Sequence, residues 1–235
     1  MGLSLALVGC GAMGSALLKG WLTLSDSQTR FKAFWVIAPH RANVEPFLED
    51  PRVQWVSSPQ ELPEDPDIIV FAVKPFIMEE ILPLYKAFHS LFITVATGKS
   101  LAFYEKFLSP PHSLIRAMPN TPVTIHQGVI ALLANATLTA DQKRLCEKCF
   151  EGLGFCTWVK SDEDIDKITA ISGSGPAYVF YLIESLAQAA ESIGFDKETA
   201  SNLALYTFWG ASTYAHISND PPSVLRQHVT SPKGT

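Results

Sequence analysis

The sequence lacks the cysteine pattern of a disulfide-rich or metal-binding protein. It has four cysteines among 235 residues, at positions 10, 146, 149 and 156. Cys146 and Cys149 have the Cys-x-x-Cys spacing, but they lie on a helical pattern with no second pair of ligands that would complete a zinc site. We therefore expect reduced, structural cysteines and no metal, which favours a cytoplasmic protein.

Long apolar runs and an excess of charge are also missing. The apolar runs at Ile68–Val73 and Leu91–Ala96 have the length of strands and are too short to span a membrane. Residues 1–9 are apolar but have no basic segment, so we interpret them as a strand and not as a signal peptide. The net charge of −5 argues against nucleic acid as the main partner. A composition with 47% hydrophobic and 17% charged residues is that of a globular protein with one large domain or two modest ones.

A glycine-rich turn follows the first apolar run. Leu3–Val8 predicts a strand, Gly9-Cys10-Gly11-Ala12-Met13-Gly14 has the spacing G-x-G-x-x-G, and an amphipathic helix is predicted from Ala12 to Leu24. In this arrangement the first glycine makes the turn, the second lets the backbone approach a pyrophosphate, and the third lets the helix pack on the strand. The stretch therefore indicates a dinucleotide-binding fold.

The end of the second predicted strand, Phe34–Ile37, bears on the choice of cofactor. A site for NAD normally has Asp or Glu at this point to bind the ribose 2′-hydroxyl. Here the sequence is Ala38-Pro39-His40-Arg41, which has no acid and offers Arg41 to a 2′-phosphate. We therefore expect NADPH, with NADH as a second possibility; an unbound surface charge is the alternative reading of Arg41.

The remaining pattern of the first half alternates strands with helices and predicts a doubly wound α/β sheet. Lys74 lies at the carboxyl end of one of these strands, where open α/β sheets bind ligands. A helix is predicted over Thr139–Gly152, and the strands are predicted at Asp67–Pro75, Phe92–Gly98, Ser113–Met118, Gly128–Asn135 and Phe155–Val159. We assign residues 1–160 to a Rossmann-type domain and residues 161–235 to a helical domain.

The second half predicts helices that cannot bury all their apolar residues. Apolar positions follow helical spacing from Pro176 to Ile193, and Gly194 ends the pattern. Asp196 has the place of an N-cap for a second helix over Lys197–Ile217, and a short helix follows near Ser223–His228. Because the apolar residues occupy several faces, we expect packing on a second copy of the chain; packing on the sheet domain is the alternative.

The stretch Ser172-Gly173-Ser174-Gly175-Pro176-Ala177-Tyr178 precedes the first of these helices. Its glycines permit unusual backbone angles, and Pro176 suits the first position of a helix. The stretch predicts a helix start whose free N–H groups bind a carboxylate or phosphate. A capped helix start with no ligand is the alternative.

Four stretches together resemble pyrroline-5-carboxylate reductase over essentially the whole chain. They are the glycine turn at residues 9–14, Ala72-Val73-Lys74-Pro75, Arg116-Ala117-Met118-Pro119-Asn120-Thr121-Pro122, and Ile171–Tyr178. The resemblance implies NADPH-dependent reduction of L-1-pyrroline-5-carboxylate to L-proline, with a Rossmann domain followed by a helical dimerisation domain. It also implies a homodimer that assembles further, commonly into a decamer.

The resemblance implies roles for individual residues. Lys74 and Thr235 are expected to be catalytic, and a phosphate or structural contact is the alternative for Lys74. The residues expected at the cofactor are Gly9, Gly11, Ala12, Met13, Gly14, Arg41, Ala72, Val73, Lys74 and Asn120. The residues expected at the substrate are Ser174, Gly175, Thr230, Ser231, Gly234 and Thr235.

The chain departs from the family's pattern near its end. The sequence Thr230-Ser231-Pro232-Lys233-Gly234-Thr235 has Lys233 in place of a glycine, and it stops where the family continues. Asn219 stands about where some members have a glutamate. We therefore expect a truncated chain that binds NADP(H) and has impaired reductase activity.

Two other functions remain open from the sequence. Another imine reductase or a β-hydroxyacid reductase would place a catalytic lysine on a helix of the second domain, but Lys197, at a helix start, is the only lysine between Ile168 and Pro232. A non-catalytic Rossmann paralogue would bind NADP(H) without turnover, and only the early end of the chain supports it.

Overall fold

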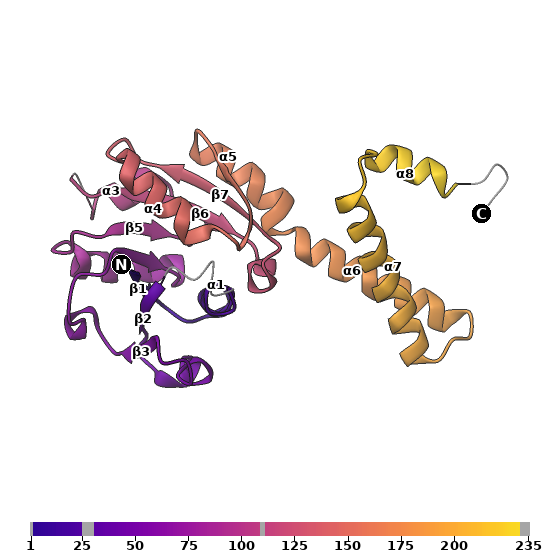
Figure 1. Cartoon of the computed structure of the whole chain (residues 1–235), viewed down its shortest axis with the longest axis horizontal. Helices are drawn as coiled ribbons and strands as arrows, with labels where there is room; N and C mark the ends of the chain where they lie inside the picture. Colours follow the sequence, from indigo (N-terminus) through magenta and orange to yellow (C-terminus); the bar gives the residue numbers. More distant parts are fainter. Residues whose placement is uncertain (1, 25–30, 109–110, 231–235) are drawn as a thin grey trace. The chain divides into compact units, whose positions relative to one another are not determined.

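The computed structural model describes residues 2–24, 31–108 and 111–230, which form two compact units. The first unit comprises residues 1–176 and contains the sheet, and the second comprises residues 177–235 and is helical (Figure 1). The predicted boundary between domains, after residue 160, lies earlier in the chain than the boundary between the two units, after residue 176. The predicted division into domains 1–160 and 161–235 stays a prediction. Within the described ranges no helix is both long and apolar enough to cross a membrane.

The first unit is built on an eight-stranded sheet with the strand order β3-β2-β1-β4-β5-β6-β7-β8. In the described part of the chain every neighbouring pair is parallel except β6 and β7. The strands are β1 (Leu3–Val8), β2 (Phe31–Ile37), β3 (Val53–Val56), β4 (Ile68–Phe71), β5 (Leu91–Thr94), β6 (Leu114–Pro119), β7 (Gly128–Ala134) and β8 (Gly154–Trp158). The predicted doubly wound fold is therefore confirmed.

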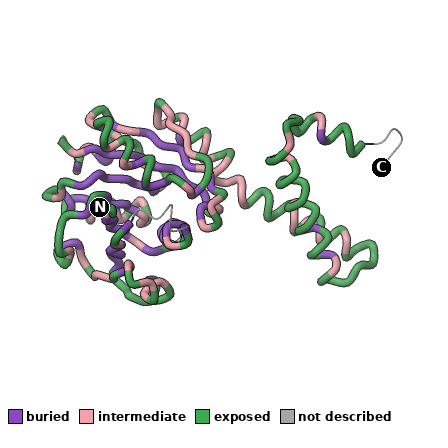
Figure 2. The backbone as a smooth tube through the Cα atoms, viewed as in Figure 1, coloured by how far each residue is buried: buried purple, intermediate pink, exposed green. Residues whose placement is uncertain are grey.

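The central strand β4 is apolar without interruption, and β1 and β5 beside it are apolar except for Ser4 and Thr94, as is typical of parallel strands that are buried on both faces. Figure 2 shows these strands buried, and β4 is buried at each of its four positions. The first predicted strand, Leu3–Val8, has the observed limits. β3, an edge strand with the exposed Gln54 in its middle, was not predicted from the sequence.

Helices cover both faces of this sheet. Alternate strand residues divide into two cores, because successive side chains of a strand point to opposite faces. One core packs the sheet against α1 (Ala12–Leu22) and α4 (Ala140–Phe150). The opposite core includes residues of α2 (Met78–Ile81), η5 (Leu82–Tyr85) and α3 (Leu101–Glu105).

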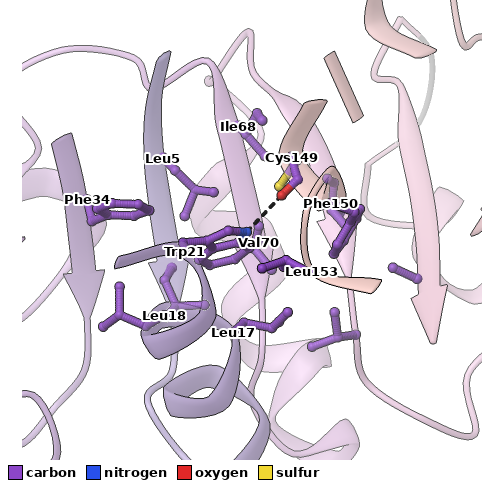
Figure 3. Close-up of a cluster of buried hydrophobic side chains, with 14 of the residues drawn as sticks. Leu5, Leu17, Leu18, Trp21, Phe34, Ile68, Val70, Cys149, Phe150 and Leu153 are labelled. Atoms are coloured by element: carbon purple, nitrogen blue, oxygen red, sulfur yellow. Dashed lines mark hydrogen bonds between the residues drawn. The ribbon is translucent and has the colours of Figure 1, made fainter. Parts of the chain in front are cut away.

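Trp21 is the centre of the first core. Its side chain is fully buried between α1 and the sheet, with its ring stacked 6.0 Å from that of Phe34 (Figure 3). The indole Nε1 donates a hydrogen bond of 2.8 Å to the carbonyl oxygen of Cys149, so the same side chain joins α1 to α4. This contact fixes the helix that follows the glycine turn.

The second unit contains α6 (Gly175–Ser192), whose first two residues belong to the first unit, α7 (Lys197–Ile217) and α8 (Pro222–His228). Gly194 has a φ of +108° and follows the end of α6, as expected of a terminating glycine. The Asp196 side chain accepts a hydrogen bond from the Thr199 N–H, which confirms the predicted N-cap of α7. Among the described residues of this unit only Ala200, Ala204 and Leu225 are buried.

Candidate active site

A cleft of about 400 Å³ lies at the carboxyl ends of several strands of the first unit. This is the edge at which open α/β sheets bind ligands. Its lining comes from the segments after β1, β2, β4 and β5 and from the end of β6. It consists of Gly9–Met13, Ala38–His40, Asn43, Ala72–Pro75, Ile77, Val95–Thr97, Met118 and Pro119. The structure thus brings together most of the residues that were predicted at the cofactor.

The glycine turn forms one wall of the cleft. Gly9 has a φ of +93°, and a Cβ at this position would lie 2.6 Å from the Val73 Cγ1. A Cβ at Gly14 would overlap the carbonyl oxygen of Gly9, whereas Gly11 is exposed and faces open space. The local geometry of each glycine therefore fits the role that the fingerprint assigns to it, and the cofactor contacts stay predictions.

The N-terminus of α1 opens toward the cleft. Gly11 is the N-cap residue, and no side chain caps its N–H groups. Ala12 and Met13, the first helical residues, line the cleft directly. Uncapped N–H groups at the positive end of a helix dipole fit an anion, so this cradle suits the pyrophosphate of a dinucleotide.

Arg41 lies outside the cleft lining in this structure. Its Nε forms an ion pair with the Glu45 Oε2 at 2.8 Å, and both side chains are more than half exposed. His40 and Asn43 line the cleft instead. Asn43 was not predicted at the site, although its position shortly after β2 was a usable signal.

Lys74 is exposed at the carboxyl end of β4 and lines the cleft together with Ala72 and Val73. The Ala72 N–H donates to the Val8 carbonyl at 2.8 Å, which fixes this segment against β1. Among the described residues the Lys74 ammonium has no hydrogen-bond or ion-pair partner. An unpaired cation at this edge suits an anionic group of a cofactor or substrate.

Asn120 is buried and does not line the cleft. Its Oδ1 accepts a hydrogen bond from the Val129 N–H at 2.8 Å, and its Nδ2 donates to the Ser172 carbonyl at 3.0 Å. Both ends of the amide are therefore occupied within the chain, and the predicted cofactor contact stays a prediction. Met118 and Pro119, the last two residues of β6, line the cleft in its place.

The helix start predicted from the glycines and the proline is observed, because α6 begins at Gly175 with Pro176 as its second residue, but the residues before it are helical as well. Helix α5 (Asp162–Ile168) begins ten residues before Ser172 with Ser161 as its N-cap, and a π-helix (Thr169–Gly173) follows it. The Ser174 N–H donates to the Thr169 carbonyl at 2.9 Å, as in the π-helical pattern. The N–H groups expected to bind an anion are thus inside a helix; contacts of Ser174 and Gly175 with substrate stay predictions.

The predicted C-terminal substrate loop is described only at its first residue. The Thr230 hydroxyl donates to the Arg226 carbonyl at 2.7 Å, just after α8. Ser231, Gly234 and Thr235 lie outside the described residues. The catalytic role predicted for Thr235 therefore has no structural account.

The cysteines are free thiols, and none of the pKa shifts indicates a reactive thiolate. Burial raises the pKa of Cys10 and of Cys156 to about 11 each. Burial also raises the pKa of Cys146 and of Cys149, which lie in the first core. Among the described residues no group of three or more potential ligands could hold a metal ion.

Comparison with known proteins identifies both halves of the chain. Residues 162–235 match the family model described as pyrroline-5-carboxylate reductase dimerisation, and residues 4–98 match the one described as NADP oxidoreductase, coenzyme F420-dependent. The pyrroline-5-carboxylate reductase of Pseudomonas aeruginosa is 34% identical over 98% of this chain and 85% of its own length. The chain belongs to the pyrroline-5-carboxylate reductase family.

Solved pyrroline-5-carboxylate reductases have the same fold. The Coxiella burnetii reductase superimposes with a TM-score of 0.87 at 33% identity, over 100% of this chain and 87% of that chain. The NADP-bound enzyme of Plasmodium falciparum gives a TM-score of 0.85 at 30% identity, over 99% of this chain and 86% of that chain. The family and the fold class predicted from the sequence are both confirmed.

Proposed function

We propose that this chain reduces L-1-pyrroline-5-carboxylate to L-proline with NADPH. The observation that carries the proposal is the glycine-framed cleft, found in a chain that covers 85% of a curated reductase at 34% identity. Membership of this family favours the pyrroline substrate over those of other imine or β-hydroxyacid reductases. No acid–base triad is required, because the substrate contains its own electrophilic C=N bond.

The cleft supports the assignment of the cofactor. When bound, NADPH supplies the hydride that adds to the imine carbon. The N–H groups of Gly11, Ala12 and Met13 are placed to hold its pyrophosphate, and Ala72 and Val73 line its path. A relative with NADP bound and the NADP oxidoreductase family model support NADPH over NADH.

We propose that the segment after β2 determines the preference for NADPH over NADH. No acidic side chain among the described residues lines the cleft at this point, so nothing there repels a 2′-phosphate. His40 is already at the cleft, and Arg41 can join it by leaving an exposed pair with Glu45. Exposed ion pairs contribute little, so this movement is not costly.

The substrate contacts are proposed from the family resemblance. Lys74 offers a cation at the cleft edge, and Ser174 and Gly175 lie directly after the π-helix. We assign the substrate carboxylate to the Thr230–Thr235 loop, with Thr235 as a catalytic contact. Lys233, which stands in place of a glycine of the family's pattern, predicts lower reductase activity.

We propose a homodimer formed through residues 161–235, as the helical domain, with further assembly such as a decamer. The match to a dimerisation model over residues 162–235 supports this, and so do the large exposed apolar side chains of α6 and α7.

Four free cysteines support a reducing cytoplasmic location.

The direct test is the loss of NADPH absorbance when the purified chain is mixed with DL-pyrroline-5-carboxylate. We expect turnover, and with NADPH deuterated on the nicotinamide ring we expect the label at the former imine carbon of proline. Gly14→Val, which would overlap the Gly9 carbonyl, is a cofactor-site control and should abolish NADPH binding. NADPH binding without turnover, even after a family-length tail is added, would favour the non-catalytic paralogue.

A further inference from the structure

One face of β6 contacts the helix that covers it at three successive points. Arg116, Met118 and Asn120 alternate along the strand and its end, so their side chains point to the same face. This face also contains the small core in which Met118 packs with Ile165 of α5. The π-helix follows α5 directly.

Arg116 makes the first contact. Its side chain is 5% exposed, and its Nη1 pairs with the Oδ1 of Asp162, the first residue of α5. Its Nη2 lies 3.9 Å from the Oδ1 of Asp166, one turn further on. The Asp162 carboxylate also accepts hydrogen bonds from the Leu101 N–H at 3.2 and 3.3 Å, so it joins α3, α5 and β6. A buried guanidinium needs such a partner, because an unpaired charge is strongly disfavoured inside a protein.

Asn120 and Met118 make the contacts at the other end. The Asn120 Nδ2 donates to the carbonyl of Ser172, a residue of the π-helix, while its Oδ1 is held by β7 through Val129. Met118 contacts Gly173 so closely that a Cβ there would lie 2.6 Å from the Met118 Cε. Met118 also lines the cleft, so it contacts both the cleft and the π-helix.

We propose that the Arg116–Asp162 pair and the Asn120 amide are positioning groups that hold the π-helix against Met118, and thereby fix the substrate end of the cofactor cleft. Neither Arg116 nor Asn120 lines the cleft, so their effect on the reaction passes through Met118 and through Ser174 and Gly175. The predicted effect on turnover rests on the proposed function. The positioning of the π-helix does not.

Asp162→Asn tests the Arg116–Asp162 pair, because it removes the charge of the carboxylate and keeps the shape of the side chain. Glu163→Gln is the matched control. It removes one negative charge from the same turn of α5, but the ion-pair partner of Glu163 is Lys167, whose side chain is exposed. Hydrogen–deuterium exchange of the full-length chain, with and without NADPH, should show peptides covering residues 169–175 exchanging on the order of tenfold faster in Asp162→Asn only. Peptides of β1 and β4 should be unchanged.

Kinetics separate positioning from loss of folded enzyme. For Asp162→Asn we expect the KM for pyrroline-5-carboxylate to rise on the order of tenfold, with the Kd for NADPH within about twofold of the parent value. A merely structural role would lower kcat through a smaller active fraction and leave both constants unchanged. Asp162→Glu, which restores the charge, should recover part of the loss.

Equal exchange over residues 169–175 in Asp162→Asn and Glu163→Gln would overturn the proposal. If Asp162→Asn does not fold, Asn120→Ala gives the same test from the other end, with faster exchange expected over residues 172–175. If the parent chain has no reductase activity, the proposed function fails, but the exchange data still decide whether the Arg116–Asp162 pair holds the π-helix.

Discussion

The two units differ in how they bury their apolar side chains. In the first unit, strands such as β4 are buried at every position, and Trp21 lies inside a core that the unit completes by itself. In the second unit, α6 has no buried residue and α7 buries two alanines, while Tyr206 and Trp209 are each about 60% exposed. A helical unit that exposes its largest aromatic residues needs a partner surface. The contrast supports the proposed homodimer, in which a second copy of the chain would cover the exposed side chains of the second unit.

The largest expected effect is that of Trp21→Ala in the first unit. The change removes a fully buried ring and leaves the Cys149 carbonyl without the indole donor. The free energy of unfolding should therefore fall by about 3–5 kcal/mol. Urea unfolding followed by circular dichroism measures this loss. A loss below about 1 kcal/mol would mean that the core around α1 repacks easily, and the contrast between the units would weaken.

Trp209→Ala is the matching change in the second unit. Because this ring is exposed, its removal should barely alter the stability of a single chain, but it should weaken self-association by roughly 2 kcal/mol, about thirtyfold in the dissociation constant. Sedimentation at several protein concentrations measures the shift. Phe155→Ala, which removes an exposed aromatic residue from the first unit, is the control and should leave association unchanged.

Gly173→Ala tests whether the position of Met118 in the first unit affects the affinity for NADPH. The new methyl group would displace the Met118 Cε toward the cleft, so NADPH should bind about tenfold more weakly. Met118→Ala in the same chain should restore most of the affinity, because it removes the displaced group. Titration by NADPH fluorescence gives both values. An unchanged Kd in Gly173→Ala would show that Met118 moves elsewhere.

The smallest effect is expected from Glu45→Gln. This change releases Arg41 from its exposed ion pair, so NADPH affinity should rise about twofold while NADH affinity stays the same. Glu64→Gln, which breaks a similar exposed pair with Lys32, is the control. A parallel rise for NADH would mean that Arg41 does not bind the 2′-phosphate.

Local signals were sufficient for much of the fold. The strand Leu3–Val8 and the helix Lys197–Ile217 were predicted with their observed limits, because an apolar run before a glycine turn and an Asp N-cap are read within a few residues. The capping box of Thr139 and Gln142 likewise explains why α4 begins where it does. β3 was missed because a short edge strand with one exposed polar residue resembles a loop.

The errors at the site arose where distant contacts decide the local structure. Gly175 and Pro176 begin α6 as their signature predicts, but the residues just before them form a π-helix that continues α5 and contacts Met118 and Asn120. Neither contact can be inferred from the segment itself. The Arg41–Glu45 pair, by contrast, has the i,i+4 spacing and could have been expected from the sequence.

The exposure of Trp209 has a practical consequence for spectroscopy. It is the only tryptophan in residues 177–235; in the first unit Trp21 and Trp35 are buried, and Trp55 and Trp158 are half-buried, so Trp209 is the most exposed of the five. An exposed indole emits at longer wavelength and is quenched by acrylamide, and both properties change when the ring is covered. Trp209 is therefore an intrinsic optical probe of the second unit, and loss of its quenching with rising protein concentration reports association without any added label.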